Sequence, residues 1–414
     1  MKKQCGKIFN RGRFIVTVVM VPIIIIFALS DKILVGLGQD PEVSHISRVY
    51  VTILIPGVWA LGQFDATKRF LSAQYSTDIP VWTQLITTIF HFLWCWLFIW
   101  KMDGREKGAA IATNITWIMN MLICDCVIRY KKHYKEDPDL TQMIRFYDMS
   151  VFRDINVYLK IGIPNMLMLC CEWWIFEILT IFSGLLGVTQ LATEVVIVNC
   201  ITFIFMIPLG ISYAASALTG NYLGEGKIDL AKKFASMTVI FDIIITSVVV
   251  LLLGIFQESI ARIFTNEEEV IKTFKSCVWV LLIYVWFDTI HGVQSGIIRG
   301  LGRQMFGFFY TMFCYVILGF PLALCLCFNG KMGIAGLWLG MTIACIILDV
   351  GFAMIISCPN WEKIANKMRS TLEAGAGRTP EVNAYREAFT PSQSKRQIAA
   401  KSNAINEAAP QFGA

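Results

Sequence analysis

Two glutamates stand inside a stretch that is otherwise suited to a lipid bilayer. Residues 170–187 read CCEWWIFEILTIFSGLLG, with Glu172 and Glu177 among apolar side chains. An ionised carboxylate near the centre of a bilayer costs about 2.5 kcal/mol or more. Glu172 is therefore expected to face protein or a water-filled cavity, or to hold a proton. Glu177 follows after roughly 140° of helical rotation, so only a broad cavity could contact both carboxylates.

Two tryptophans next to Glu172 extend the chemistry of this stretch. Trp173 and Trp174 supply flat π faces beside the carboxylates. Carboxylates combined with aromatic faces recognise organic cations. The stretch is thus predicted to bind such a cation in alternation with a proton, and both tryptophans are predicted to line the site. A plainer interpretation is that each glutamate only pairs with a basic residue or caps a neighbouring helix.

A third acid, Asp288, ends another apolar segment, VWVLLIYVWFD. Tyr284 precedes it by one helical turn, and His291 and Ser295 follow by one and two turns. This polar stripe predicts a proton- or cation-binding face, although such stripes also hold membrane helices together. His291 is expected to pack or to contact another helix. Four further aspartates are expected near helix ends, solvated at the membrane surface; they are Asp65, Asp125, Asp242 and Asp349.

The composition is that of a helical membrane protein. Hydrophobic residues make up 56% of the 414-residue chain and charged residues 16%, with a mean hydropathy of +0.60. Soluble domains average about 45–50% apolar and about 25% charged residues. The net charge of +6 is modest and does not indicate a nucleic-acid partner. Because the sequence shows neither metal-ligand spacing nor a nucleotide-binding loop, we expect no cofactor or metal, and an ion gradient as the energy source.

Ten apolar runs are long enough to cross a bilayer, which requires about 20 residues per helix. We therefore expect an all-α polytopic membrane protein. A charged cytoplasmic linker is predicted at 130–157, and a largely disordered cytoplasmic tail at 358–414. The predicted spans lie near 14–37, 47–70, 79–100, 108–129, 158–187, 195–220, 234–256, 276–298, 306–328 and 333–357.

The distribution of lysine and arginine predicts that both termini are cytoplasmic. With that orientation, 27 of these residues lie on the cytoplasmic side and 9 on the opposite side. Long segments follow this rule less closely, and without the linker and the tail the numbers are 12 and 9. The pattern does not distinguish the plasma membrane from an internal acidic compartment.

Weak self-similarity divides the chain into two parts. The end of the first predicted span resembles the end of the seventh, and Phe64-Asp65 in the second resembles Phe287-Asp288 in the eighth. A third match joins the loops after the third and ninth spans, and the three offsets are 227, 223 and 225 residues. A near-constant offset indicates two halves of like topology. The second half has two additional spans in front of the repeated block, so the chain is predicted to contain four plus six helices.

Several segments resemble the eukaryotic branch of the multidrug and toxic compound extrusion (MATE) transporters. The resemblance extends over most of 14–356. Three of the motifs are highly specific for the family. The matching segments are CCEWWIFEILTIFSGLLG (170–187), IPLGISYAASALTGNYLGEGK (207–227), GVQSGIIRGLGRQMFG (292–307), GLGQDPEV (36–43) and GIAGLWLG (333–340).

The resemblance implies twelve helices in two lobes, and exchange of protons for organic, commonly cationic, substrates by alternating access. It places functional acids at Glu172, Glu177 and Asp288, and it places Asn199 where animal members carry a further glutamate. Only ten spans are predicted, so the first two helices of the family are expected to be absent. The expected domains are an N-terminal lobe of four helices at 1–129 and a C-terminal lobe of six at 158–357.

We therefore predict a secondary active efflux transporter for multiple drugs or organic cations, and not an enzyme. Protons are the expected coupling ion, and the sequence does not exclude sodium. Asn199, Tyr284 and Gln294 are predicted to line the substrate site together with the two tryptophans. There are three alternatives: a flippase for lipid-linked cargo, a non-transporting remnant and a membrane-embedded enzyme. The flippase is disfavoured because no arginine is expected in mid-helix.

Overall fold

The computed structural model describes residues 2–36, 38–74, 76–130, 152, 155–357 and 361–366. The regular structure in these ranges is helical, which confirms the predicted all-α class. The predicted linker at 130–157 and tail at 358–414 lie almost entirely outside the described residues. The labelled helices are α1 (Lys2–Ala28), α2 (Ser30–Gly36), α3 (Pro41–Ala73), α4 (Asp78–Cys95), η1 (Trp96–Lys101), α5 (Arg105–Tyr130), α8 (Ile155–Gly184), α9 (Val188–Glu225), α10 (Ile228–Ile255), α11 (Gln257–Phe264), α12 (Glu268–Gly300), α13 (Gln304–Met312), η3 (Phe313–Gly319), α14 (Phe320–Leu324), η4 (Cys325–Asn329) and α15 (Ile334–Ser357).

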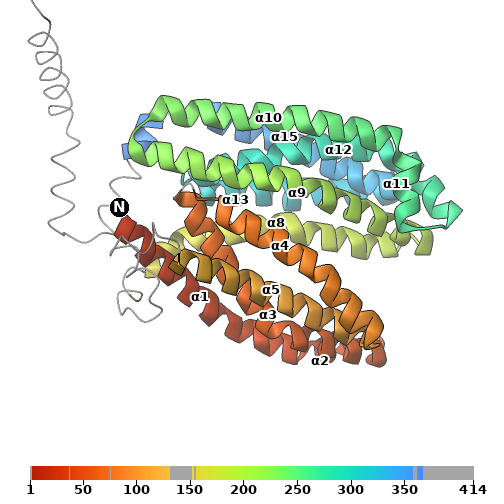
Figure 1. The fold of residues 1–414 in the computed structure, drawn as a ribbon. Coiled ribbons are helices and arrows are strands. Elements are labelled where there is room, and N and C mark those ends of the chain that lie inside the picture. The colour runs from red at the N-terminus through yellow and green to blue at the C-terminus, as the bar shows by residue number, and fades with distance from the viewer. Residues whose placement is uncertain are drawn as a thin grey trace, which may run out of the picture.

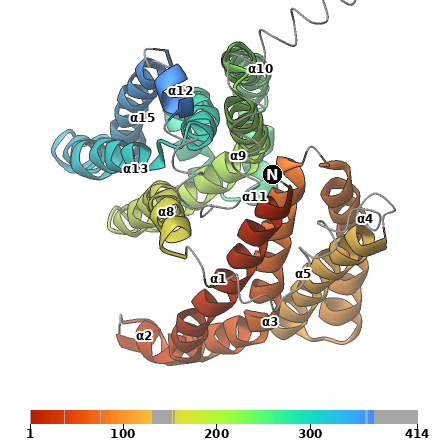
Figure 2. The same cartoon turned by 90° about the vertical axis from the view of Figure 1, so that its left-hand side faces the viewer.

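Ten helices among the described residues are long and apolar enough to cross a membrane, as predicted. They form two groups that are visible as separate bundles in Figure 1 and Figure 2. We call α1–α5 the N-lobe and α8–α15 the C-lobe. The bundles touch where α3 meets α9: the Asn221 side-chain amide donates to the carbonyl oxygen of Ala73 at 3.1 Å. Nearby, the Arg69 guanidinium lies 4.7 Å from the ring centroid of Tyr213.

The same order of helices occurs in both lobes. In each, a long helix is followed by a short one and then by a 33-residue helix: α1, α2 and α3 correspond to α10, α11 and α12. The offset is 227 residues at both ends of the 33-residue helices. With this register, Asp288 corresponds to Leu61, so the predicted match between Asp65 and Asp288 is wrong. Asp65 instead forms an exposed ion pair with Lys68.

A cluster of ion pairs holds α11 against the start of α12. Arg262 contacts Glu258 at 3.1 Å and Glu268 at 2.8 Å, and the Lys275 ammonium lies 2.7 Å from Glu258. Hydrogen bonds from Lys275 and Arg262 lower the pKa of Glu258. The stabilisation is therefore present above the ordinary pKa of a glutamate and is lost as the pH falls through the lowered value. All these groups are exposed, so the contribution is small.

The membrane span Gln304–Asn329, which precedes α15, is a single helix with two π-helical segments. α13 passes into η3, α14 and η4 without leaving the helical path. Pro321 has no N–H to donate to the carbonyl of the residue four positions earlier, and that residue lies in η3. Tyr315 lies in η3, and its side chain is buried in the core of the C-lobe.

Glycines on α12 allow an unusually close contact with α9. A Cβ built on Gly296 would collide with the Ser212 carbonyl oxygen and lie 2.6 Å from the Ser212 hydroxyl. That hydroxyl donates to the carbonyl oxygen of Gly292 at 2.6 Å. In contrast, a Cβ added to Gly210 or Gly224 on α9 would meet no atom within 4 Å, so glycine content alone does not mark the packed face.

Replacing Gly296 by alanine should destabilise the protein. Forcing an extra methyl group into a packed contact costs about 1–3 kcal/mol. An alanine in a helix without such a contact gains about 0.5–1 kcal/mol over glycine. Thermal unfolding of purified protein in detergent should therefore show a lower Tm for Gly296→Ala, and an unchanged or higher Tm for the control Gly210→Ala. Equal Tm values for the two variants would contradict the close α9–α12 contact.

Candidate functional site

Glu172 lies on α8 with its side chain directed into the C-lobe. It is 7% exposed, and its Oε1 atom is 3.1 Å from Nε2 of His291 on α12. The nearest partner of this carboxylate is thus a histidine, which can be neutral or charged, and not a lysine or an arginine. The sequence placed His291 on the polar stripe of its helix, but nothing in the spacing indicated a contact with Glu172.

Asp288 lies on the same helix as His291, one turn earlier. The Tyr284 hydroxyl donates to its Oδ1 atom at 2.9 Å, and both side chains are buried. Tyr284 in turn packs edge-to-face against Trp338 and Phe176. The structure therefore buries three of the predicted site residues in the C-lobe, with Glu172 next to His291 and Asp288 bonded to Tyr284.

The part of α12 that follows Asp288 is buried on every side. Each residue from Asp288 to Ile298 is buried, because α9, α10 and α15 all pack against α12. Polar groups on such a helix have no water and must find partners within the protein. Gln294 is an exception: it is 6% exposed, and its Oε1 atom has no hydrogen-bond partner in the described part of the chain.

Two aspartates expected at the membrane surface are in fact buried. Asp242 on α10 is inaccessible and lies beside the Thr289 hydroxyl, which itself donates to the carbonyl oxygen of Trp286. Asp349 on α15 is 6% exposed. Each lies roughly 20 Å from the start of its helix, at about 1.5 Å per residue, so the prediction of interfacial solvation was wrong for both.

A further buried acid was missed entirely. Glu194 on α9 is fully buried, and its Oε2 atom accepts a hydrogen bond from the Trp338 indole nitrogen at 2.7 Å. The predicted span began at residue 195, whereas α9 begins at Val188. Glu194 therefore fell just outside the predicted span, although a tryptophan on α15 covers it.

The other predicted site residues lie on exposed surfaces. Glu177 on α8 is exposed, and the Asn199 amide on α9 donates to the carbonyl oxygen of Val195 in its own helix at 2.7 Å. Trp174 is largely exposed, and Trp173 is partly so, with its ring edge-to-face to Phe205. These four positions are not part of the buried cluster, and their roles stay predictions.

The C-lobe interior is acidic. We use the term acidic core for the buried set Glu172, Asp242, Asp288, His291 and Asp349. His291 is within electrostatic reach of Glu172, Asp349 and Asp288, and Asp349 is also influenced by Asp242. Arg299, further along α12, bonds to the Ser212 hydroxyl at 2.6 Å and acts on Glu172 from a distance.

The N-lobe contains a polar network on the corresponding helices, with balanced charge. Arg13 on α1 donates to the Gln63 side-chain oxygen on α3 at 2.8 Å and to the Asp125 carboxylate on α5 at 2.9 Å. The predicted first span began at residue 14 and excluded Arg13; this was wrong, because α1 begins at Lys2 and α3 and α5 cover the guanidinium. Asp125 lies near the end of α5, as expected, but it pairs with Arg13. An arginine is thus present in mid-helix, but it is already paired.

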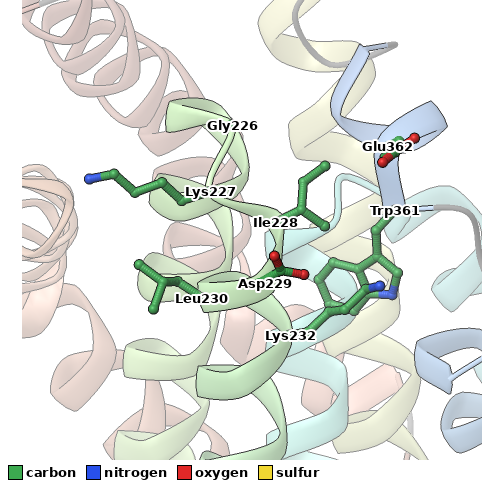
Figure 3. Close-up of a pocket in the computed structure, with 8 residues that line it drawn as sticks. All are labelled: Gly226, Lys227, Ile228, Asp229, Leu230, Lys232, Trp361 and Glu362. Carbon is green, nitrogen blue, oxygen red and sulfur yellow. The ribbon is translucent and has the colours of Figure 1, made fainter. Parts of the chain in front are cut away.

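Figure 3 shows an open pocket at the end of the C-lobe, between the α9–α10 turn and the helical residues 361–366. Its volume is about 720 Å³. It contains none of the acidic core, so it is not the candidate site. Its lining residues are Gly226, Lys227, Ile228, Asp229, Leu230, Lys232, Trp361 and Glu362. Within the described ranges, no group of three or more His, Cys, Asp or Glu side chains has a metal-binding arrangement.

Comparison with known proteins identifies the family. The MatE family model matches residues 1–97 and 164–325, one stretch in each lobe and more than half of the chain together. The chain belongs to the MATE family. It is an integral membrane protein, with ten helices that can cross the bilayer.

Individual relatives of this MATE protein come from plants and animals. Protein DETOXIFICATION 16 of Arabidopsis thaliana is 30% identical over 373 residues, which are 89% of this chain and 75% of the relative. Multidrug and toxin extrusion protein 1 of Danio rerio is 30% identical over 365 residues. The match covers 87% of this chain but only 60% of the fish protein, so the chain spans less than two thirds of that relative.

Solved structures show the same fold. The crystal structure of the eukaryotic MATE transporter AtDTX14 superimposes with a TM-score of 0.83 at 27% identity, over 89% of this chain and 81% of that chain. An outward-facing multidrug resistance MATE transporter of the MOP superfamily has a TM-score of 0.71 at 16% identity, over 85% of this chain and 79% of that chain.

Removing the hydrogen bond between Trp338 and Glu194 should destabilise the C-lobe. Trp338→Phe leaves a buried carboxylate without its donor, which costs about 1–3 kcal/mol or more. Glu194→Leu leaves the indole N–H without its acceptor. The double variant replaces both polar groups, so its loss of Tm should be smaller than the sum of the two single losses. Strictly additive losses would show that the two side chains do not interact.

Proposed function

We propose that this MATE protein exports organic cations in exchange for protons, by alternating access between the N-lobe and the C-lobe. Glu172 is the main coupling group and Asp288 the second. Family membership supports transport, and relatives carry names that refer to detoxification and to multidrug and toxin extrusion. The buried position of Glu172 beside a histidine carries the assignment of the coupling site.

The identity of the partner of Glu172 matters for this proposal. A lysine or an arginine would fix the charge of the carboxylate and leave it with a structural role. A histidine can lose its charge near neutral pH, so the pair can exist in more than one protonation state. Glu172 can therefore be released for a proton or for a cationic substrate without breaking a permanent ion pair.

The transport cycle follows from the alternating occupancy of the acids. An ionised carboxylate attracts an organic cation, and Trp173 and Trp174 on the same helix offer exposed π faces for it. Protonation from the outside removes the negative charge and releases the cation. The proton then leaves on the cytoplasmic side after the lobes have reoriented. We propose that both termini are cytoplasmic, in the plasma membrane or in an internal acidic compartment.

Transport of lipid-linked phosphates would require free basic groups at the substrate site. Arg13 is engaged by Gln63 and Asp125, and Arg299 by Ser212. The acids of the C-lobe favour a positively charged substrate instead.

A vesicle assay tests the proposed exchange. Purified protein in proteoliposomes should take up tetraphenylphosphonium when a pH gradient is imposed, and a sodium gradient should have no effect. Glu172→Gln keeps the shape and polarity of the side chain but cannot ionise. It should reduce gradient-driven uptake at least tenfold, which corresponds to about 1.4 kcal/mol or more.

The matched control is Glu106→Gln, an exposed glutamate in the first turn of α5, which should leave uptake unchanged. Uptake driven by sodium would replace protons as the coupling ion. Full pH-driven uptake by Glu172→Gln would refute the assignment of Glu172. A parent protein that moves neither this cation nor a fluorescent lipid would support a non-transporting remnant, and lipid movement alone would support a flippase.

A further inference from the structure

The imidazole of His291 contacts side chains from three other helical segments. Its Nε2 atom is 3.1 Å from Glu172 on α8, and its ring packs between Tyr315 of η3 and Phe352 of α15. The other ring nitrogen, Nδ1, is buried and has no hydrogen-bond partner among the described residues. One nitrogen of the imidazole is therefore used and the other is available.

Asp349 is the candidate partner for that second nitrogen. It lies on α15, three residues before Phe352, is 6% exposed, and neither of its carboxylate oxygens has a partner in the described part of the chain. After Glu172, it is the carboxylate with the strongest electrostatic effect on His291, ahead of Asp288. A buried carboxyl group without a partner is unfavourable, so its presence needs an explanation.

The titratable and charged groups around this histidine come from several helices. Glu172 is on α8, Asp288 and Tyr284 are on α12, Tyr315 is on η3, and Cys345 and Asp349 are on α15. Asp242 on α10 acts on Asp288 and Asp349, and Arg299 acts on Glu172. Of these groups, only Glu172 and Asp349 are carboxylates from neighbouring helices that act directly on the imidazole.

We propose that His291 transfers protons between Glu172 and Asp349, so that Asp349 is a second proton site inside the C-lobe. The proposal rests on the proton coupling proposed above and adds a route to it. In one state Asp349 is protonated and donates to Nδ1, while Nε2–H donates to ionised Glu172. The Asp349 O–H bond then breaks as Nδ1–H forms, and the Nε2–H bond breaks as Glu172 gains the proton.

This exchange conserves atoms and charge. The imidazole is neutral before and after, and one proton has moved from α15 to α8. The reverse sequence moves a proton from Glu172 to Asp349, away from an incoming cation. A histidine is suited to this step because its two nitrogens exchange the roles of donor and acceptor. The arginine in the N-lobe network cannot serve in this way, since a guanidinium stays protonated.

The contact between Nδ1 and Asp349 is not made in the present structure. Both groups are without a hydrogen-bond partner, so the Asp349 side of the proposed relay is not formed, while the contact with Glu172 is formed. The proposed relay requires a rotation of the Asp349 side chain or a bridging water at this point, and such a water is nearly as good as a direct bond. The contacts of His291 with Glu172 and with Asp349 can thus form at different times.

Nitrogen-15 NMR provides a test that does not depend on transport. The chain contains four histidines, so protein labelled with [15N]histidine gives few signals, and His291→Gln identifies those of His291. Asp349→Asn should move the midpoint of the His291 pH titration by about one pH unit, as expected when a nearby charge is removed. Asp242→Asn, which removes an equally buried carboxylate that does not act directly on the ring, should move it much less. Equal midpoints in parent and Asp349→Asn would refute the proposed contact.

A transport measurement tests the relay itself. With tetraphenylphosphonium in proteoliposomes, His291→Gln and Asp349→Asn should each lower the pH-driven turnover at least tenfold, with KM changed less than about twofold. Asp349→Glu, which retains a carboxyl group, should restore a substantial part of the rate. Asp103→Asn, at an exposed aspartate in the loop before α5, should leave the rate unchanged. Parental rates and pH profiles in both His291→Gln and Asp349→Asn would overturn the proposal and leave a packing role for the histidine.

The two proposals fail in different ways. A parent protein that does not exchange the cation for protons refutes the proposed function, while the NMR titration still decides whether Asp349 contacts His291. A parent that transports normally, loses transport in Glu172→Gln and keeps it in Asp349→Asn retains the proposed function and refutes the relay.

Discussion

A carboxylate enclosed by apolar helices has to find a hydrogen-bond donor or carry a proton, and in the C-lobe α12 supplies the partners of two such acids. α12 is surrounded by α9, α10 and α15, so its polar stripe has no access to bulk water. Tyr284 supplies a donor to Asp288, and His291 reaches across to Glu172 on α8. The helices α9 and α12 approach each other closely at Gly296, further along the same buried stretch.

The two lobes use one helical plan with different electrostatics. In the N-lobe, a permanent cation at Arg13 is matched by Asp125, and together with Gln63 the pair joins three helices. In the C-lobe, several acids face one histidine, whose charge depends on pH. A balanced pair is suited to holding helices together, whereas an excess of carboxylates around a titratable ring is suited to exchanging ions. The two lobes therefore share an arrangement of helices, and their different chemistry comes from different side chains at positions within it.

Much of the fold could be predicted from the sequence, because apolar runs of sufficient length identify membrane helices directly. The same signal placed Glu172 and Asp288 inside predicted membrane helices. It failed at the ends of helices, where α1 and α9 begin well before the apolar runs do and neighbouring helices cover Arg13 and Glu194. It also could not reveal the contact between His291 and Glu172, since pairing between helices 119 positions apart leaves no local pattern.

The π-helical segment η3 has a consequence for how one helix serves two neighbours. A π turn holds one residue more than an α turn, so everything after it is rotated about the helix axis. Before η3, Gly307 packs against Met168 of α8; after it, Ala323 packs against Gly340 of α15. With uninterrupted α-helical winding, the two contact faces would not both point inward. A single extra residue of winding thus allows the ninth membrane helix to change partners halfway across the bilayer.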